Sequence, residues 1–274
     1  MNKDKLQNIL CVILPIVFIG VLAGGLFKAK SDNKELIKLK DKYETSINTS
    51  SKPEKGSKED ETVSNSKTEE QEEKFNFEEK SILFFGDGVS VDGKFQGIAA
   101  EQLKLKGYTN GARGGLLLGA MDDEVTADSL KDIDIVVILG GTNDYSQGKE
   151  LGKISDAYEA DTFYGDVQGM IDNLKAMKDD IEIVFLTPLK HGDIEGQPSY
   201  PNANYNGDYL DDYVAAIIEV CEKNNVKYID MFNKSGIDEN NVGEYTYNNI
   251  MLNEEGHKLV GTVIAEQLKE LFQE

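Results

Sequence analysis

Residues 133–144 read IDIVVILGGTND, an apolar run that ends in two glycines and three polar residues. Residues 81–88, SILFFGDG, are built in the same way. Short runs that are rich in β-branched and aromatic residues and closed by turn residues are typical of buried strands. Two more such runs, IEIVFLT at 181–187 and VKYID at 226–230, follow along the chain. The sequence therefore predicts four buried strands.

Amphipathic patterns separate these runs, at about residues 93–106, 161–178, 207–225 and 254–272. Their apolar residues recur with the period of a helix. Strands that alternate with helices form a parallel sheet covered by helices on both faces, which is a three-layer α/β/α fold. In open sheets of this class, sites form just beyond the carboxyl ends of the strands. The residues that follow each strand are therefore the first candidates for a site.

An uncharged run of 19 residues, Ile9–Phe27, lies near the N-terminus. That length is enough to span the hydrocarbon core of a bilayer as a helix. Two lysines precede the run and two follow it, so charge orients it only weakly. We predict that residues 1–30 are an uncleaved single-pass anchor in the cell membrane, with the remaining chain extracellular. Secretion after cleavage of a signal peptide is the alternative.

The segment that follows the apolar run is polar and highly charged. Between residues 48 and 74, Val63 is the only sizeable hydrophobic residue. Such a segment cannot bury enough apolar surface to fold by itself. We predict a flexible linker over residues 31–78 that holds a folded domain, residues 79–274, away from the membrane.

The net charge of the chain is −21, and 36 of its 50 acidic residues lie in residues 79–274. An acidic domain excludes nucleic acid as a partner, because a phosphate backbone requires a basic face. The two cysteines, Cys11 and Cys221, cannot form a zinc cluster of the usual kind. The sequence contains no motif for a cofactor or a metal ion, so we expect neither.

Four short blocks follow the predicted strands in chain order. They are Gly86-Asp87-Gly88, NGARGG at 110–115, Gly141-Thr142-Asn143-Asp144 and NNIMLNEEGH at 248–257. In order and spacing they resemble the sequence blocks of the SGNH, or GDSL, hydrolases, across about residues 81–272. This resemblance implies a flavodoxin-like three-layer fold. It also implies a family that hydrolyses esters or removes acyl groups, often from carbohydrates.

The resemblance places the three catalytic residues of the family at positions where this chain has other side chains. Gly88 stands where the family has its serine nucleophile, Met251 where it has histidine, and Asn248 where it has aspartate. A thioether cannot shuttle a proton, and an amide is uncharged. The implied oxyanion positions match at Asn143 and at Gly115 (or Gly114). The blocks thus predict a retained pocket without the Ser-His-Asp chemistry.

Several other residues are candidates for a site. Ser90, two residues past Gly88, is the alternative nucleophile, with His191 as a base that reaches the cleft from a loop. Arg113, the only arginine, either binds an anionic group of a ligand or forms an ion pair with an acidic neighbour such as Asp122 or Asp144. We favour the ion pair. His257 matches the family's second, non-catalytic histidine. The binding residues that we expect are Asp87, Arg113, Gly115, Asn143 and His191.

The sequence therefore favours a membrane-tethered pseudoenzyme that binds a carbohydrate, another cell-envelope ligand or a protein partner in the inherited cleft. Tyr200, Tyr205 and Tyr209 lie in a loop that could present aromatic rings to a sugar. The alternatives are an active esterase, deacetylase or acyltransferase that acts on acylated glycans through Ser90, and a structural protein that does not use the cleft.

Overall fold

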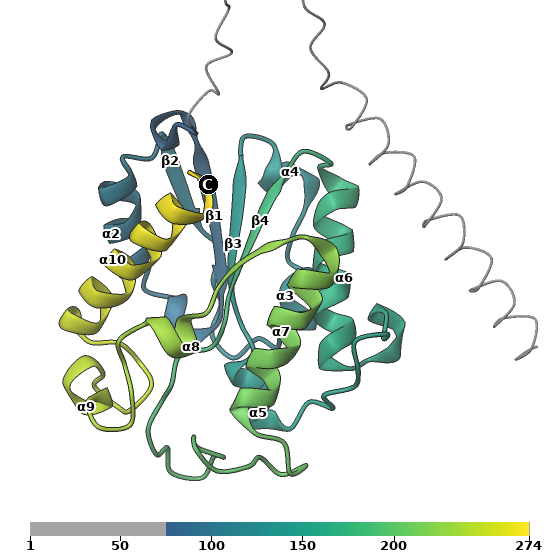
Figure 1. The fold of residues 1–274 in the computed structure, drawn as a ribbon, viewed down its shortest axis with the longest axis vertical. Helices are drawn as coiled ribbons and strands as arrows, with labels where there is room; N and C mark the ends of the chain where they lie inside the picture. Colours follow the sequence, from purple (N-terminus) through teal and green to yellow (C-terminus); the bar gives the residue numbers. More distant parts are fainter. Residues whose placement is uncertain (1–74, 274) are drawn as a thin grey trace, which may run out of the picture. The chain divides into compact units, whose positions relative to one another are not determined.

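Five parallel strands form one sheet in the order β2-β1-β3-β4-β5 (Figure 1). The computed structural model describes residues 75–273 of the chain. The strands are β1 (Ser81–Gly86), β2 (Gly107–Asn110), β3 (Ile135–Leu139), β4 (Glu182–Leu186) and β5 (Lys227–Ile229). This is the flavodoxin-like order, in which the crevice lies between the carboxyl ends of β1 and β3.

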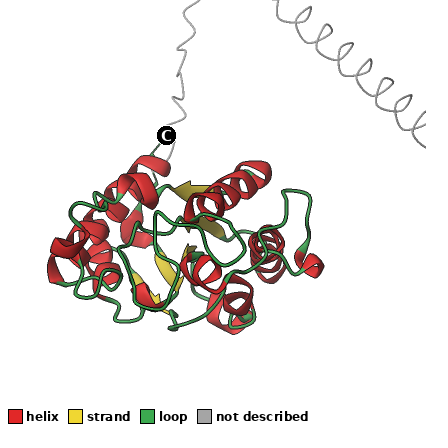
Figure 2. Cartoon of the chain, turned by 90° about the horizontal axis from the view of Figure 1, so that it is seen from below, coloured by secondary structure: helices red, strands yellow, loops and turns green. Residues whose placement is uncertain are grey.

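Helices cover both faces of the sheet (Figure 2). Side chains that alternate along β1 and β3 point to opposite faces, so each strand contributes to two hydrophobic clusters. Leu83 and Phe85 pack in the cluster under α6 (Phe163–Met177) and α7 (Leu210–Asn224). Ile82 and Phe84 pack in the other cluster, under α2 (Lys94–Leu103) and α10 (Glu254–Leu271). The predicted three-layer α/β/α architecture is confirmed.

The four predicted strands and the four predicted long helices are all present, and their ends differ from the prediction by a few residues. The shorter helices are α3 (Leu118–Asp122), α4 (Ala127–Leu130), α5 (Thr142–Gln147), α8 (Met231–Lys234) and α9 (Val242–Tyr245). Single 3₁₀ turns cover Phe77–Glu79, Gly88–Ser90 and Tyr158–Ala160. Strand β2 was not predicted, because it is a short edge strand whose middle residues are exposed.

The folded unit begins a few residues before the expected boundary at residue 79. Phe77 is buried, and its ring lies 4.9 Å from that of Phe75 and 5.6 Å from that of Phe272, between centroids. These aromatic contacts join the start of the domain to the end of α10. Phe75 and Phe77 therefore belong to the domain and not to the linker.

The predicted membrane anchor and most of the predicted linker lie outside the described residues. Within residues 75–273, no helix is both long enough and apolar enough to cross a bilayer.

Candidate functional site

The first block of the site follows β1 directly. Gly86 lies beside Leu139 in the register of β1 and β3, so the residues after both strands meet at the same edge of the sheet. Asp87 caps the 3₁₀ turn Gly88–Ser90, because its Oδ1 accepts a hydrogen bond from the Val89 backbone nitrogen at 3.0 Å. This turn fixes the direction in which position 88 faces.

Gly88 faces Met251. A Cβ atom added at Gly88 would lie 3.8 Å from the Met251 sulfur, which is ordinary van der Waals contact, and would meet no other atom within 4 Å. The two positions that the resemblance assigns to the nucleophile and the base are thus neighbours in space, although 163 residues separate them in the sequence. We call the space between them the Gly88–Met251 slot.

The third triad position, Asn248, turns its side chain toward its own loop. Its Oδ1 accepts hydrogen bonds from the backbone nitrogens of Met251, at 2.7 Å, and Ile250, at 3.4 Å. Asn248 therefore holds the backbone at position 251. The Gly88–Met251 slot contains no hydroxyl nucleophile and no imidazole base from the three triad positions.

The second block runs along the carboxyl end of β1. The Arg113 backbone nitrogen donates to the Gly86 carbonyl at 2.9 Å. Two residues further on, Gly115 is exposed, and its φ of 79° lies in the left-handed region that glycine adopts without strain. A Cβ atom there would meet nothing within 4 Å. The backbone at Gly115 is therefore open to a bound ligand.

Asn143 lies in the first turn of α5, where the third block begins a helix. Its Nδ2 donates a hydrogen bond to the Leu116 carbonyl at 2.9 Å. An amide nitrogen has two N–H donors, so this bond leaves one of them for a ligand. Asn143 is thus joined to the loop residue that directly follows Gly115.

Two carboxylates are buried beneath these blocks. Both oxygens of Asp144 lie 3.2 Å from the Leu118 backbone nitrogen, which ties the third block to α3. Burial raises the pKa of Asp144 to about 7, with smaller contributions from the charges of Asp166 and Asp87. Burial likewise raises the pKa of Asp87 to about 6. Asp87 thus holds the first block in place through its hydrogen bond to Val89. Its side chain is buried and is not exposed to a ligand.

The Arg113 side chain pairs with Glu124. This is the acidic-neighbour reading that the sequence favours, although the partner is neither Asp122 nor Asp144. Both side chains of the pair are exposed, so the guanidinium lies at the surface of the second block.

Ser90 lies beneath the first block instead of in the slot. It is buried, and its hydroxyl has no hydrogen-bond partner within residues 75–273. A Cβ atom on Gly86 would come within 2.3 Å of the Ser90 oxygen, so this hydroxyl lies against the backbone of β1. A serine nucleophile requires an accessible hydroxyl and a bonded base, and Ser90 has neither here.

His191 is buried, with an exposed fraction of 3%. The histidine that the sequence offers as a base from a loop is thus enclosed by the domain. Its Nδ1 lies 3.0 Å from the Gly192 carbonyl, its Nε2 has no partner in the described part of the chain, and its ring lies 6.0 Å from that of Tyr145. Burial lowers its pKa, so the neutral form is favoured. The next residue, Gly192, donates its backbone N–H to the Asn249 carbonyl at 2.8 Å, which joins this loop to the fourth block.

The remaining histidine and the loop tyrosines that the sequence analysis named differ in their burial. His257 is buried, and its Nε2 lies 2.9 Å from Asp92 Oδ2, which links α10 to the loop before α2. Tyr200 packs edge-on against Phe232 at 5.3 Å between centroids. Tyr205 and Tyr209 are exposed. Of the three loop tyrosines, these two present their rings to solvent.

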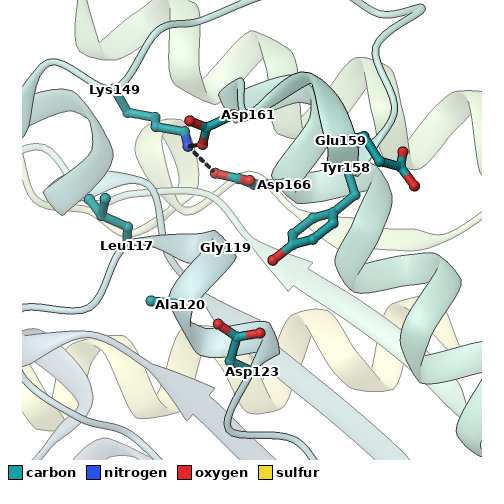
Figure 3. A pocket seen from close by; sticks show the side chains of 9 residues that line it. All are labelled: Leu117, Gly119, Ala120, Asp123, Lys149, Tyr158, Glu159, Asp161 and Asp166. Atoms are coloured by element: carbon teal, nitrogen blue, oxygen red, sulfur yellow. Dashed lines mark hydrogen bonds and ion pairs between the residues drawn. The ribbon is translucent and has the colours of Figure 1, made fainter.

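Sequence reasoning missed a cavity of about 400 Å³ (Figure 3) whose first lining residue, Leu117, comes two residues after the second block. Its lining residues come from α3, from the segment after α5 and from the start of α6: Leu117, Gly119, Ala120, Asp123, Lys149, Tyr158, Glu159, Asp161 and Asp166. None of the four blocks contains them, so no motif could have indicated them. Within residues 75–273, no three His, Cys, Asp or Glu side chains are grouped so that they could hold a metal ion.

The parallel five-stranded sheet, with helices on both faces and the four blocks following its strands, defines the class of protein as a three-layer α/β/α domain. The chain belongs to the GDSL-like lipase/acylhydrolase family, whose model matches residues 83–259. No protein with a curated description matches the chain.

Solved structures share the fold at low sequence identity. A protein from Lactobacillus plantarum is 19% identical with a TM-score of 0.64, over 70% of this chain and 98% of that one. A possible lipase from Chitinophaga pinensis is 18% identical with a TM-score of 0.58, over 72% and 100%. The lipase/acylhydrolase from Enterococcus faecalis is 19% identical with a TM-score of 0.50, over 70% and 96%. These likenesses describe the fold alone.

Proposed function

We propose that this protein is a non-catalytic member of its family, and that it binds a carbohydrate or another cell-envelope ligand in the inherited cleft. The observation that carries the proposal is that Gly88 faces Met251, so that a side chain at position 88 would touch the Met251 sulfur. A nucleophilic hydroxyl and a proton-accepting base are both required for acyl transfer by the family mechanism. Glycine and methionine supply neither at these positions.

The retained oxyanion positions support binding. Gly115 keeps an open backbone, and Asn143 keeps one free N–H donor, so a polar ligand group would find donors at the edge of the cleft. A carbohydrate offers hydroxyl and acyl oxygens that accept such hydrogen bonds. The rings of Tyr205 and Tyr209, in the segment that leads into α7, are exposed and would offer aromatic surface to a sugar.

The proposed location follows from the sequence of residues 1–78. The uncharged run Ile9–Phe27 would anchor the chain in the cell membrane, and the charged linker would let the domain reach ligands outside the cell. Protease digestion of intact cells tests the orientation, because an extracellular domain would be released from the anchor. Loss of residues 1–30 from the mature chain would favour the secreted alternative.

Restoring the triad tests the catalytic part of the proposal. The full-length chain and the variant Gly88→Ser/Asn248→Asp/Met251→His are compared on p-nitrophenyl acetate and on an acetylated glycan. We expect no turnover by the natural chain above the buffer rate, and measurable turnover by the variant. The matched control is Gly88→Ala/Asn248→Asp/Met251→His, which differs from the variant by one oxygen atom and should be inactive.

Turnover by the natural chain that Ser90→Ala abolishes would overturn the proposal in favour of a relocated nucleophile. Binding is tested separately, by the effect of the acetylated glycan on the melting temperature of the full-length chain. We expect a rise in the natural chain and no rise in Gly88→Leu, whose side chain would fill the slot. No rise in either chain would leave the cleft without a carbohydrate ligand and would favour a structural role.

A further inference from the structure

The fourth block begins in a short hairpin beside the Gly88–Met251 slot. Thr246 and Leu252 form an antiparallel bridge, and the Tyr247 backbone nitrogen donates to the Met251 carbonyl at 3.0 Å. Tyr247 and Met251 are therefore the next opposite pair of the two arms, which residues 248–250 connect. We call residues 246–252 the site hairpin.

The two faces of the site hairpin differ. Successive side chains along an extended arm point to opposite faces, and residues opposite each other share a face. Thr246 and Leu252 are buried, so their face packs on the domain. Tyr247 and Met251 consequently share the outer face, with their Cβ atoms about 5 Å apart. Because Gly88 faces Met251, the Tyr247 side chain lies next to the slot.

Tyr247 is one of the most exposed aromatic residues of the domain. It is 68% exposed, and among the large apolar residues that the structure describes only Tyr205 is more exposed. A single exposed ring is ordinary at a protein surface. The position of Tyr247 is what distinguishes it, because this ring is the neighbour of a triad position.

The backbone that carries the ring is fixed by side-chain hydrogen bonds on both sides. Thr246 Oγ1 donates to the Val242 carbonyl at 2.7 Å, which ties the site hairpin to α9. Asn249 Nδ2 donates to the Asp193 carbonyl at 2.7 Å, which ties it to the loop after β4. A ring on a fixed backbone costs a ligand less ordering entropy than a ring on a mobile loop.

The surface around the ring is free of charge. Residues 245–253 read YTYNNIMLN and contain no charged residue, although charged residues make up 29% of the chain. In the neighbouring blocks Asp87 is buried, and the Arg113 guanidinium pairs with Glu124. The site hairpin therefore offers neither a cation for an anionic group nor a carboxylate for an amine.

An amide beside the ring supplies polar groups. Asn248 is exposed, and its Oδ1 accepts the hydrogen bonds from the backbone of its own loop. Its Nδ2 donates no hydrogen bond within residues 75–273, so both of its N–H donors are available to a ligand. Asn143 has a further N–H donor at the start of α5.

An aromatic ring, amide donors and the absence of charge together suit a neutral sugar. The C–H groups on one face of a pyranose pack against an aromatic ring, and its hydroxyls accept hydrogen bonds from amides. The chain has a net charge of −21, which repels an anionic polymer that no basic residue of the site hairpin would attract.

We infer that Tyr247 is the platform of a sugar subsite beside the slot, and that its ligand is a neutral oligosaccharide with one pyranose stacked on the Tyr247 ring. The inference rests on the proposed function. It adds the residue that would hold the sugar and the charge class of the carbohydrate.

The first test compares oligosaccharides of equal length that differ in charge. Isothermal titration of the full-length chain uses a tetramer of N-acetylglucosamine, which is neutral, and a hyaluronan tetramer, in which every second sugar carries a carboxylate. We expect the neutral tetramer to bind at least about tenfold more tightly, because like charges repel. Equal or tighter binding of the hyaluronan tetramer would overturn the assignment of a neutral ligand.

The second test removes the ring. Tyr247→Ala should weaken binding of the neutral tetramer about five- to tenfold, and Tyr247→Phe, which keeps the ring, should stay within about twofold of the natural chain. The matched control is Tyr108→Ala. Tyr108 is 46% exposed on β2 and pairs with Ile82, about 13 Å along β1 from Gly86 and the slot. Its loss should leave the affinity unchanged.

Unchanged affinity in Tyr247→Ala, or equal weakening by Tyr108→Ala, would overturn the inference. A loss in Tyr247→Phe as large as that in Tyr247→Ala would assign the effect to the hydroxyl and reject stacking. Melting temperatures confirm that each variant is folded, as expected for a side chain on the surface.

Failure of the inference is distinguishable from failure of the proposed function. Binding of the neutral tetramer that Gly88→Leu abolishes and Tyr247→Ala leaves unchanged would keep the proposed function and reject the sugar platform alone. Binding of neither tetramer to the natural chain would reject carbohydrate as the ligand of the cleft, and the inference would fall with it. Turnover by the restored triad has no bearing on these outcomes.

Discussion

The Asn248 side chain accepts a hydrogen bond from the Met251 backbone nitrogen at 2.7 Å. Position 248 therefore sets the conformation of the loop at position 251 through the backbone. This contact does not require a histidine side chain at position 251. The Asn248 side chain thus holds the loop of the fourth block in place through backbone contacts alone.

The first prediction concerns this contact. Asn248→Asp keeps the accepting oxygen, so the free energy of unfolding should stay within about 0.5 kcal/mol of the natural value. Asn248→Ala removes the acceptor and should cost about 1 kcal/mol, the net value of a typical hydrogen bond. Chemical denaturation of both variants checks this. Equal stability of the two variants would mean that the side chain does not hold the loop.

The second prediction compares two glycines of the site. At Gly88 a Cβ atom would meet only Met251, so Gly88→Ala should not strain the folded state. Because alanine lowers the conformational entropy of the unfolded chain, the free energy of unfolding should stay the same or rise by up to about 1 kcal/mol. At Gly256, in the first turn of α10, a Cβ atom would lie 2.0 Å from the Tyr245 carbonyl oxygen. Gly256→Ala should therefore cost at least about 2 kcal/mol. In a helix whose surface is exposed to solvent, a change from glycine to alanine stabilises the folded state. A higher melting temperature for Gly256→Ala would therefore contradict the close approach of Gly256 to the Tyr245 carbonyl.

Much of this fold could be predicted from the sequence because its core strands are continuous apolar runs. Strands β1, β3 and β4 are almost fully buried, and β5 at the other edge of the sheet is buried only at Ile229. The runs of all four end sharply at glycine, at threonine or at a charged residue. Strand β2 could not be recognised in this way. It pairs only with β1, at the edge of the sheet, and its sequence GYTN has no apolar run.

The site was only partly accessible to the same reasoning. The blocks placed Gly88 and Met251 in one site, and in the structure Gly88 faces the Met251 side chain. The burial of His191 could not be predicted, because its loop is fixed by Asn249, far along the chain. The cavity that Asp166 lines could not be predicted either, because helices and loops that are separate in sequence meet there. Periodicity reports the neighbours of a residue within its own helix or strand, and it does not report these contacts.

The third prediction concerns the dependence of stability on pH. The pKa of buried Asp144 is raised to about 7 from the model-compound value of 3.8. The folded state therefore holds a proton that the unfolded state releases between these values, so stability falls as the pH rises from about 4 to about 7. Asp144→Asn cannot ionise and should escape this loss, which is about 4 kcal/mol over the whole range and about 3 kcal/mol between pH 5 and pH 8. Denaturation at pH 5 and pH 8 measures the difference.

The control for this prediction is Asp180→Asn, an exposed position in the turn before β4. The stability of this variant should follow that of the natural chain at both pH values, because the substitution lies at the surface and changes no buried group. A gap between Asp144→Asn and the natural chain that stays constant from pH 5 to pH 8 would show that Asp144 does not titrate in this range.

The last prediction concerns Lys149, whose ammonium lies 3.2 Å from the buried Asp166 carboxylate. Lys149→Met leaves that carboxylate without its cation, which should cost about 1–3 kcal/mol at pH 8 because Asp166 must then ionise alone or take up a proton. The cost should shrink as the pH falls, since a protonated carboxyl needs no counter-charge and burial already raises its pKa. Denaturation at pH 5 and pH 8 measures this, with the exposed Lys131→Met as the control that should change little at either pH. An equal cost at both pH values would assign the effect of Lys149 to packing of its aliphatic stem rather than to its charge.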